Sequence, residues 1–207
     1  MLSTLLQSLC AGLTIALGGS VFLACGNRYA GAVLFSVALL CICYLGYYLY
    51  TGKIGFFPED ATRKNALHLA VGLCGNLLAA FAAGWVVRVA LPALGEQAAT
   101  VMAGKLLQSF PQSLLRGMFC GMLMYLAVAL FRKGTPLGVL FCVPVFILCG
   151  FEHSIADMFY FGASGLMDGQ AARFFPAVVL GNTLGAMLLP LLNKIGKIQR
   201  KEEKQDA

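Results

Sequence analysis

An apolar run over residues 139–161 with four polar side chains near its middle is the feature that most limits the fold of this chain. The four are Glu152, His153, Ser154 and Asp157. Ionisable groups inside a bilayer are costly when unpaired, so they usually face a cavity and mark a functional site. A helix broken at Gly150 would turn its backbone toward such a cavity. We therefore predict a site here. The alternative is a buried polar cluster that only joins helices.

The composition places the whole chain in a membrane. Of its 207 residues 59% are hydrophobic and 12% are charged, whereas soluble domains are about half apolar and about a quarter charged. A span needs about 20 apolar residues, so the chain has room for about six or seven spans. We predict one transmembrane domain over residues 1–207, with little chain left for a soluble part.

Six apolar stretches can be separated by polar turns. The predicted spans cover, approximately, residues 2–24, 30–46, 66–91, 114–131, 139–161 and 175–192. The second span continues into Tyr47–Lys53, where Gly46 and Gly52 bracket a bulky aromatic segment that carries Thr51. We interpret it as a second interrupted helix, with a short piece over residues 54–57 that ends at Pro58. The alternative is an aromatic belt at the membrane surface.

The basic residues predict the orientation. Six spans put both termini on one side, and that side carries the larger share of Lys and Arg, as cytoplasmic loops do. This side would hold Lys53, Arg63, Lys64, Arg132, Lys133 and the basic tail, and the other Arg28, Arg88, Lys105, Arg116 and Arg173. We predict a multi-pass protein of the inner or plasma membrane with cytoplasmic termini. Because this topology accounts for the basic residues, the net charge of +6 does not indicate a nucleic-acid partner.

Two similar strings suggest an internal repeat. Gly75–Ala80 reads G-N-L-L-A-A and Gly181–Ala186 reads G-N-T-L-G-A, about half the chain apart. Each string follows an interrupted span, and with three spans per half the halves cross the membrane in opposite senses. We predict inverted repeats over about 1–92 and 105–193 and a cytoplasmic tail over 194–207. The alternative is a pair of small-residue packing motifs.

Motifs for metal binding or catalysis are absent from the sequence. The eight cysteines form no C-x-x-C pair. The two histidines, His68 and His153, are far apart, and neither H-E-x-x-H nor G-x-S-x-G occurs. Ser154 follows His153 directly, so on a helix the two would not share a face. We predict that the protein is not an enzyme and needs no cofactor or metal.

Several strings together resemble one known family. They are F-E-H-S-I-A-D-M at Phe151–Met158, L-Y-T-G at Leu49–Gly52, R-G-M-F-C at Arg116–Cys120, L-A-V-A at Leu126–Ala129 and the two G-N strings. In this order they resemble the formate–nitrite transporter family over nearly the whole chain. The resemblance implies an all-α, aquaporin-like bundle of six transmembrane helices with two interrupted helices. It also implies a homopentamer with one pore per protomer for small monovalent anions such as formate, nitrite or hydrosulfide.

The resemblance also assigns candidate site residues by position. The central donors would be His153 and Thr51, and Lys105 would lie in the outer vestibule. One hydrophobic constriction would be Phe35 with Phe146. The residues implied for the other constriction are Leu39, Leu49 and Tyr50. We expect structural support from the polar residues Glu152, Asp157, Asn76 and Asn182, and Glu152 in particular needs a buried partner, for which Asn76, Asn182 and Ser154 are candidates.

Three positions depart from the family pattern. Asp157 stands where Asn is usual and adds a negative charge near the anion path. Gly121 stands where Asn is frequent and removes a donor from the pore side. Tyr50 stands where Phe is common and adds a hydroxyl at the inner constriction. These differences bear on substrate preference and gating.

The sequence therefore predicts a channel or proton-linked carrier for a small weak-acid anion, with formate as the first choice. Lys105 would raise the anion concentration at one mouth. Between the constrictions His153 would donate a hydrogen bond or lend a proton, because its unperturbed pKa lies near neutrality. The alternatives are nitrite or hydrosulfide as substrate and an aquaporin-like pore for neutral solutes, although the chain has no Asn-Pro-Ala motif.

Overall fold

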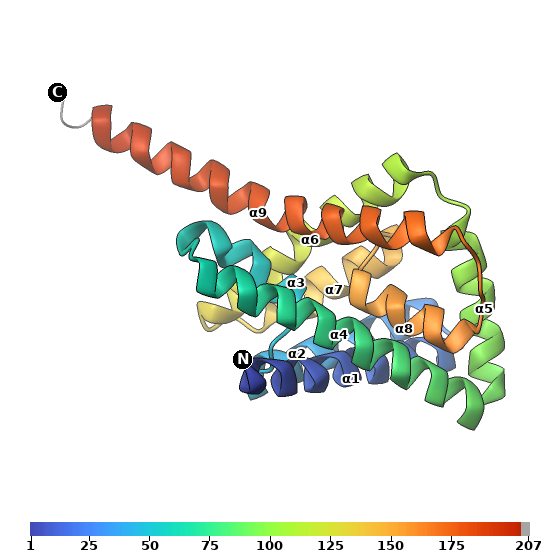
Figure 1. The fold of residues 1–207 in the computed structure, drawn as a ribbon. Helices are drawn as coiled ribbons and strands as arrows, with labels where there is room; N and C mark the ends of the chain where they lie inside the picture. Colours follow the sequence, from blue (N-terminus) through green and yellow to red (C-terminus); the bar gives the residue numbers. More distant parts are fainter. Residues whose placement is uncertain (204–207) are drawn as a thin grey trace.

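The computed structural model describes residues 1–203 as a bundle of helices (Figure 1), with side chains through residue 199. In chain order the elements are α1 (Leu2–Ala24), α2 (Arg28–Leu45), α3 (Tyr50–Lys53), the 3-10 helix η1 (Ile54–Glu59), α4 (Arg63–Ala90), α5 (Pro92–Leu106), α6 (Phe110–Arg132), α7 (Leu137–Cys149), α8 (Ser154–Ser164) and α9 (Ala171–Glu203).

Within the described residues, five helices are long and apolar enough to cross a membrane: α1, α2, α4, α6 and α9. Helices α7 and α8 bend by 54° at a short break and together make a sixth candidate span. The predicted fold class is thereby confirmed. The predicted spans lie within these helices to within a few residues, but α9 is longer than expected. It continues past the apolar part and projects from the bundle (Figure 1), so the described part of the predicted tail is helical.

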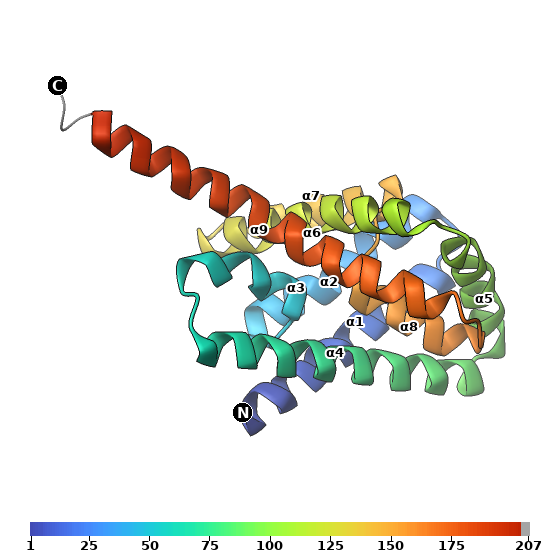
Figure 2. The ribbon, with the colours of Figure 1, turned by 45° about the horizontal axis from the view of Figure 1, so that its top comes forward.

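The two ends of the bundle differ. The N-terminus, the end of α9 and the α3–η1 segment lie toward one end, which we call the terminus side, and α5 lies at the other end (Figures 1 and 2). Helix α5 packs against α8 and α4 there. The chain between the third and fourth predicted spans thus forms a helix at the end of the bundle opposite the termini.

Both predicted interruptions are present. Helix α2 stops at Gly46 and α7 stops at Gly150, and both glycines have a φ of 70°. This left-handed conformation ends a helix at little cost only for glycine. The chain then runs without helix through residues 47–49 and 151–153 before α3 and α8 begin. Each break therefore frees backbone N–H and C=O groups inside the bundle, where they need partners.

Small residues set the distance between α6 and α9, the most extensively packed pair of helices. A Cβ atom added at Gly121 would collide with backbone atoms of Asn182 and Ala186. Gly121 therefore faces α9, and its missing side chain serves close packing. The expectation of a donor lost from the pore side is wrong, since a larger residue here would push α9 away.

Large apolar side chains cover the outside of the spans. Leu17, Leu78 and Phe141 each expose more than 60% of their surface. Such a surface is stable when lipid or other subunits cover it. This distribution agrees with the composition and with a multi-pass membrane protein.

The packing of Gly121 can be tested with Gly121→Leu. The added side chain meets backbone atoms that cannot move aside, so we expect a loss of about 1–3 kcal/mol or more in the free energy of unfolding. Thermal unfolding in detergent would measure this. Gly196→Leu is the matched control, because no atom lies within 4 Å of a Cβ there. Equal melting temperatures for the two variants would contradict the packing role.

Candidate functional site

A cavity of about 410 Å³ opens at the α5 end of the bundle. Its lining includes five charged side chains, Arg28, Lys105, Arg116, Glu152 and Asp157. The cavity also reaches aromatic side chains and the imidazole at the α7–α8 break, namely Phe35, Phe146 and His153. A charged mouth thus leads to an apolar, aromatic interior.

The aromatic part is formed as the resemblance implies. The rings of Phe35 and Phe146 meet edge to face with centroids 6.3 Å apart. Phe146 stacks on the His153 ring at a centroid distance of 5.7 Å. All three side chains are buried. A solute passing from the cavity would meet the two phenyl rings directly beside the imidazole.

The two helix breaks meet at one hydrogen bond. Thr51 on α3 and His153, the residue before α8, are far apart in sequence, yet Oγ1 and Nε2 lie 2.8 Å apart. The side chains are 1% and 2% exposed. The two predicted central donors are therefore brought together, at a place where they have almost no exposed surface.

The hydrogen bonds of His153 define its tautomer. Its Nδ1 lies 3.2 Å from the backbone N of Ala156, which can only donate, so Nδ1 accepts. A neutral imidazole then carries its proton on Nε2 and donates to the oxygen of Thr51. The hydroxyl proton of Thr51 remains available to another acceptor. The position at the start of α8 also disfavours an imidazolium, because the helix dipole is positive there.

Two asparagines satisfy the backbone of the two breaks in the same way. Asn76 accepts from the N–H of Tyr50 at 2.8 Å and donates to the carbonyls of Tyr48 and Ser8. Asn76 is completely buried. Asn76, on α4, thus joins the chain between α2 and α3 to α1.

Asn182 repeats this arrangement at the second break. It accepts from the N–H of Ser154 at 2.9 Å and donates to the carbonyls of Glu152 and Gly117. The predicted support by these two asparagines is consistent with this geometry. However, Asn182 bonds the backbone of Glu152 and not its carboxylate.

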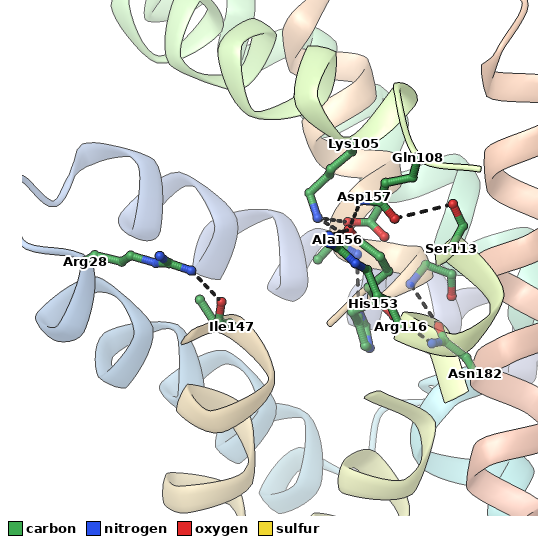
Figure 3. A network of polar contacts seen from close by, with 12 residues as sticks. Arg28, Lys105, Gln108, Ser113, Arg116, Ile147, His153, Ala156, Asp157 and Asn182 are labelled. Carbon is green, nitrogen blue, oxygen red and sulfur yellow. Dashed lines mark hydrogen bonds and ion pairs between the residues drawn. The ribbon is translucent and has the colours of Figure 1, made fainter. Parts of the chain in front are cut away.

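The carboxylate of Glu152 has different partners. It pairs with the Lys105 ammonium, accepts from Nε2 of Gln108 at 2.6 Å and lies 3.8 Å from Arg116. Figure 3 shows Lys105, Gln108 and Asp157 of this cluster gathered at one place. Asn76, Asn182 and Ser154, the partners suggested from sequence, are therefore wrong for this carboxylate. Gln108 lies just beyond the end of α5, three positions after Lys105, and no signal in the sequence connects it to Glu152.

Asp157 shares the same ammonium. Its Oδ1 lies 3.0 Å from Nζ of Lys105, while its Oδ2 and the Oγ of Ser154 are buried without a hydrogen-bond partner among the described residues. Burial by itself lowers the pKa of Lys105, but the carboxylates of Asp157 and Glu152 raise it above its ordinary value. Lys105 is therefore a cation whose charge is largely balanced, and not the isolated positive vestibule residue expected.

A second cavity of about 130 Å³ lies on the terminus side of Thr51. It is lined by Leu39 and Leu49, as the resemblance implies, and by Lys53 and Arg132. Tyr50 does not line it; its hydroxyl lies 2.7 Å from Oγ1 of Thr183, on α9. The two cavities share no lining residue.

His68 lies outside this region. His68 lies near the start of α4, where its Nδ1 is 2.6 Å from Oγ1 of Thr4. No group of three or more potential metal ligands occurs among the residues described. The arrangement defines a polytopic helical membrane protein with a buried polar contact between two cavities at opposite ends, as expected for a channel or transporter.

The chain belongs to the formate/nitrite transporter family, whose model matches residues 1–194. It is 29% identical over 219 residues to the uncharacterized transporter YwcJ of Bacillus subtilis (strain 168), over 89% of this chain and 84% of that protein. It is also 29% identical over 177 residues to the uncharacterized transporter YrhG of the same strain, over 75% of this chain and 66% of that protein.

Two solved structures have the same fold. A pentameric formate channel with formate bound matches with a TM-score of 0.79 and 19% identity, over 95% of this chain and 97% of that one. A channel described as an FNT family ion channel matches with a TM-score of 0.79 and 21% identity, over 91% of this chain and 87% of that one. The match to the family model confirms the family resemblance. The protein is a membrane anion channel or transporter and not an enzyme.

The role of Asn182 gives a prediction. Asn182→Ala leaves the buried N–H of Ser154 and two carbonyls without partners, and we expect it to lower the free energy of unfolding by about 1–3 kcal/mol. Thermal unfolding in detergent, with Asn193→Ala on the exposed part of α9 as control, would measure the loss. The same melting temperature in both variants would contradict the role of Asn182.

Proposed function

We propose that this chain carries a small monovalent weak-acid anion across the membrane, with formate as the first candidate. The observation that supports this most directly is the buried contact between His153 and Thr51. It lies between two separate cavities, with aromatic residues on one side and aliphatic residues on the other. The formate-bound structure of the same fold makes formate the first substrate to test.

The anion would lose its water in steps. Arg28 and Arg116 line the cavity at the α5 end beside the largely balanced Lys105, and the net positive charge of this lining raises the local anion concentration. Phe35 and Phe146 then exclude water. A bare anion in such a constriction is costly, so donors must replace its hydration or a proton must neutralise it.

His153 and Thr51 can supply these donors. In the neutral tautomer His153 offers its Nε2–H, and the Thr51 hydroxyl has a proton of its own to donate. Because the two side chains bond each other, an approaching anion must open this bond or pass beside it. The opened pair would then present two donors to the anion. A proton lent by His153, with the ring taking one up from a cavity at the same time, would let the anion cross the second constriction as a neutral acid.

Glu152 and Asp157 hold the outer end of this path. Glu152 joins α5 to the second break through Lys105 and Gln108, and Asp157 extends the cluster to α8. The two carboxylates reduce the positive charge at the mouth. We infer that they fix Lys105 in place and limit how strongly the mouth retains anions.

Three further proposals concern the assembly. The matching roles of Asn76 and Asn182 support inverted repeats over about 1–92 and 105–193. The exposed apolar faces and the pentameric structure of the same fold support a homopentamer with one path per protomer. Lys53, Lys64 and Arg132 on the terminus side support cytoplasmic termini in an inner or plasma membrane.

The proposed function predicts the behaviour of His153→Ala and Thr51→Val. Both remove a donor from the dry segment, and we expect formate flux into proteoliposomes to fall by about tenfold or more, as for the loss of a buried donor worth about 1.5–3 kcal/mol. Thr100→Val, an exposed change on α5, is the control.

Two outcomes would contradict the proposal. If His153→Ala conducts formate like the wild type at every pH, the imidazole has no part in transport. If the wild type passes water or glycerol but no formate, nitrite or hydrosulfide, the path is one for neutral solutes.

Asp157→Asn is expected to strengthen formate binding, whereas His153→Ala and Thr51→Val reduce formate flux. It removes one negative charge beside Lys105, so formate should bind more readily at the α5 end and half-saturate transport from that side at a lower concentration. Asp168→Asn, on the exposed loop before α9, is the control. A higher half-saturating concentration in Asp157→Asn than in the control would contradict this role.

A further inference from the structure

Two cations on the terminus side have no part in the function described so far. Lys53 ends α3 and Arg132 ends α6. Both side chains line the small cavity next to Leu39 and Leu49, and both also line a larger one of about 410 Å³. They therefore lie between the second constriction and the wider space at this end of the bundle.

No carboxylate pairs with either cation in the part of the chain whose side chains are described. The ion pairs found there involve only Lys105 and Arg116. Glu59 and Asp60 line the larger cavity, but Asp60 accepts a hydrogen bond from Asn65 at 2.6 Å. At this end of the path the described carboxylates thus make no direct ion pair with the cations, whereas Glu152 and Asp157 pair with Lys105 at the other end.

Aromatic rings support both cations. Nζ of Lys53 lies 5.2 Å from the centroid of the Tyr48 ring, and Cζ of Arg132 lies 3.5 Å from that of Phe56. A ring holds a cation by its face, so the N–H groups of the guanidinium remain available to an acceptor. Neither side chain makes a hydrogen bond with another described residue through its charged group.

The two positive charges lie near each other, because both side chains line the same two cavities. Lys53 is half-buried and Arg132 is exposed. Holding like charges together beside an apolar wall is unfavourable, and an anion between them removes the repulsion. Helices α3 and α6 are in contact, so their packing keeps the pair together.

We propose that Lys53 and Arg132 form an anion-binding site at the terminus-side mouth, where a small monovalent anion is held before it enters, or after it leaves, the constriction at Leu39 and Leu49. This inference rests on the proposed function. The ligand chemistry is that of a singly charged oxyanion, and the small size of the inner cavity favours a free anion over a lipid phosphate.

Transport measured separately from each side tests the site. Protein is reconstituted in vesicles of neutral phosphatidylcholine, and protease access to a C-terminal tag sorts vesicles by orientation. The half-saturating formate concentration is then determined for each side. Lys53→Gln and Arg132→Gln should each raise it about three- to fivefold on the terminus side, the size expected for losing one partly exposed ion contact. The double variant should raise it further.

Three comparisons make the test specific. The α5 side should stay within about twofold of wild type, because its cations are untouched. Lys53→Arg should keep most of the wild-type behaviour, since it retains the charge. Lys133→Gln is the matched control, because this exposed neighbour of Arg132 lines neither cavity.

The outcomes separate this inference from the proposed function. If the wild type carries no formate, the proposed function fails. If the wild type carries formate but the two neutral variants match Lys133→Gln on the terminus side, or change both sides equally, the site is absent. An effect seen only in vesicles with anionic phospholipid would assign the cations to a lipid headgroup and overturn the proposal. Arg132→Gln, at an exposed position, keeps the test decisive if Lys53→Gln does not assemble.

Discussion

Backbone groups inside a bilayer must find hydrogen-bond partners within the protein, and this constraint determines how the two helix breaks are stabilised. Two helices stop at Gly46 and Gly150, so groups that a continuous helix would pair become free. Asn76 and Asn182 take up these groups, each with one acceptor and two donor contacts. The breaks can then persist at the centre of the bundle, where they bring Thr51 and His153 into contact.

The cations at the two mouths of the path differ in whether carboxylates pair with them. At the α5 end, Lys105 is paired with Glu152 and Asp157, which keeps the side chain in position and weakens its hold on a passing anion. At the terminus side, Lys53 and Arg132 lie on aromatic rings without a described acidic partner. Under the proposed function, this asymmetry gives an anion a weaker site at one end and a stronger one at the other.

The spans, the two breaks and the His153–Thr51 pair could be predicted because each leaves a local mark: an apolar run, a glycine beside polar residues, or a family string. The partners of Glu152 could not. They come from α5 and the start of α6, which only the folded bundle brings to the second break. Gly121 shows the same limit, since its sequence position suggested a lost pore donor while its Cβ direction points at the α9 backbone. The contact of Tyr50 with Thr183 could not be predicted for a similar reason. The side-chain directions of a four-residue helix such as α3 depend on how the surrounding helices pack against it.

The position of His153 bears on how a proton would travel. Its Nδ1 accepts from the first turn of α8, and the helix dipole there disfavours a positive ring. A neutral imidazole in this setting shares its Nε2 proton in a hydrogen bond and stores a second proton poorly. Loss of its only ring proton would leave a buried imidazolate, so under the proposed function the ring takes up a proton from one of the two cavities as it lends one through Nε2. The ring then stays neutral, and the anion passes on as the neutral acid.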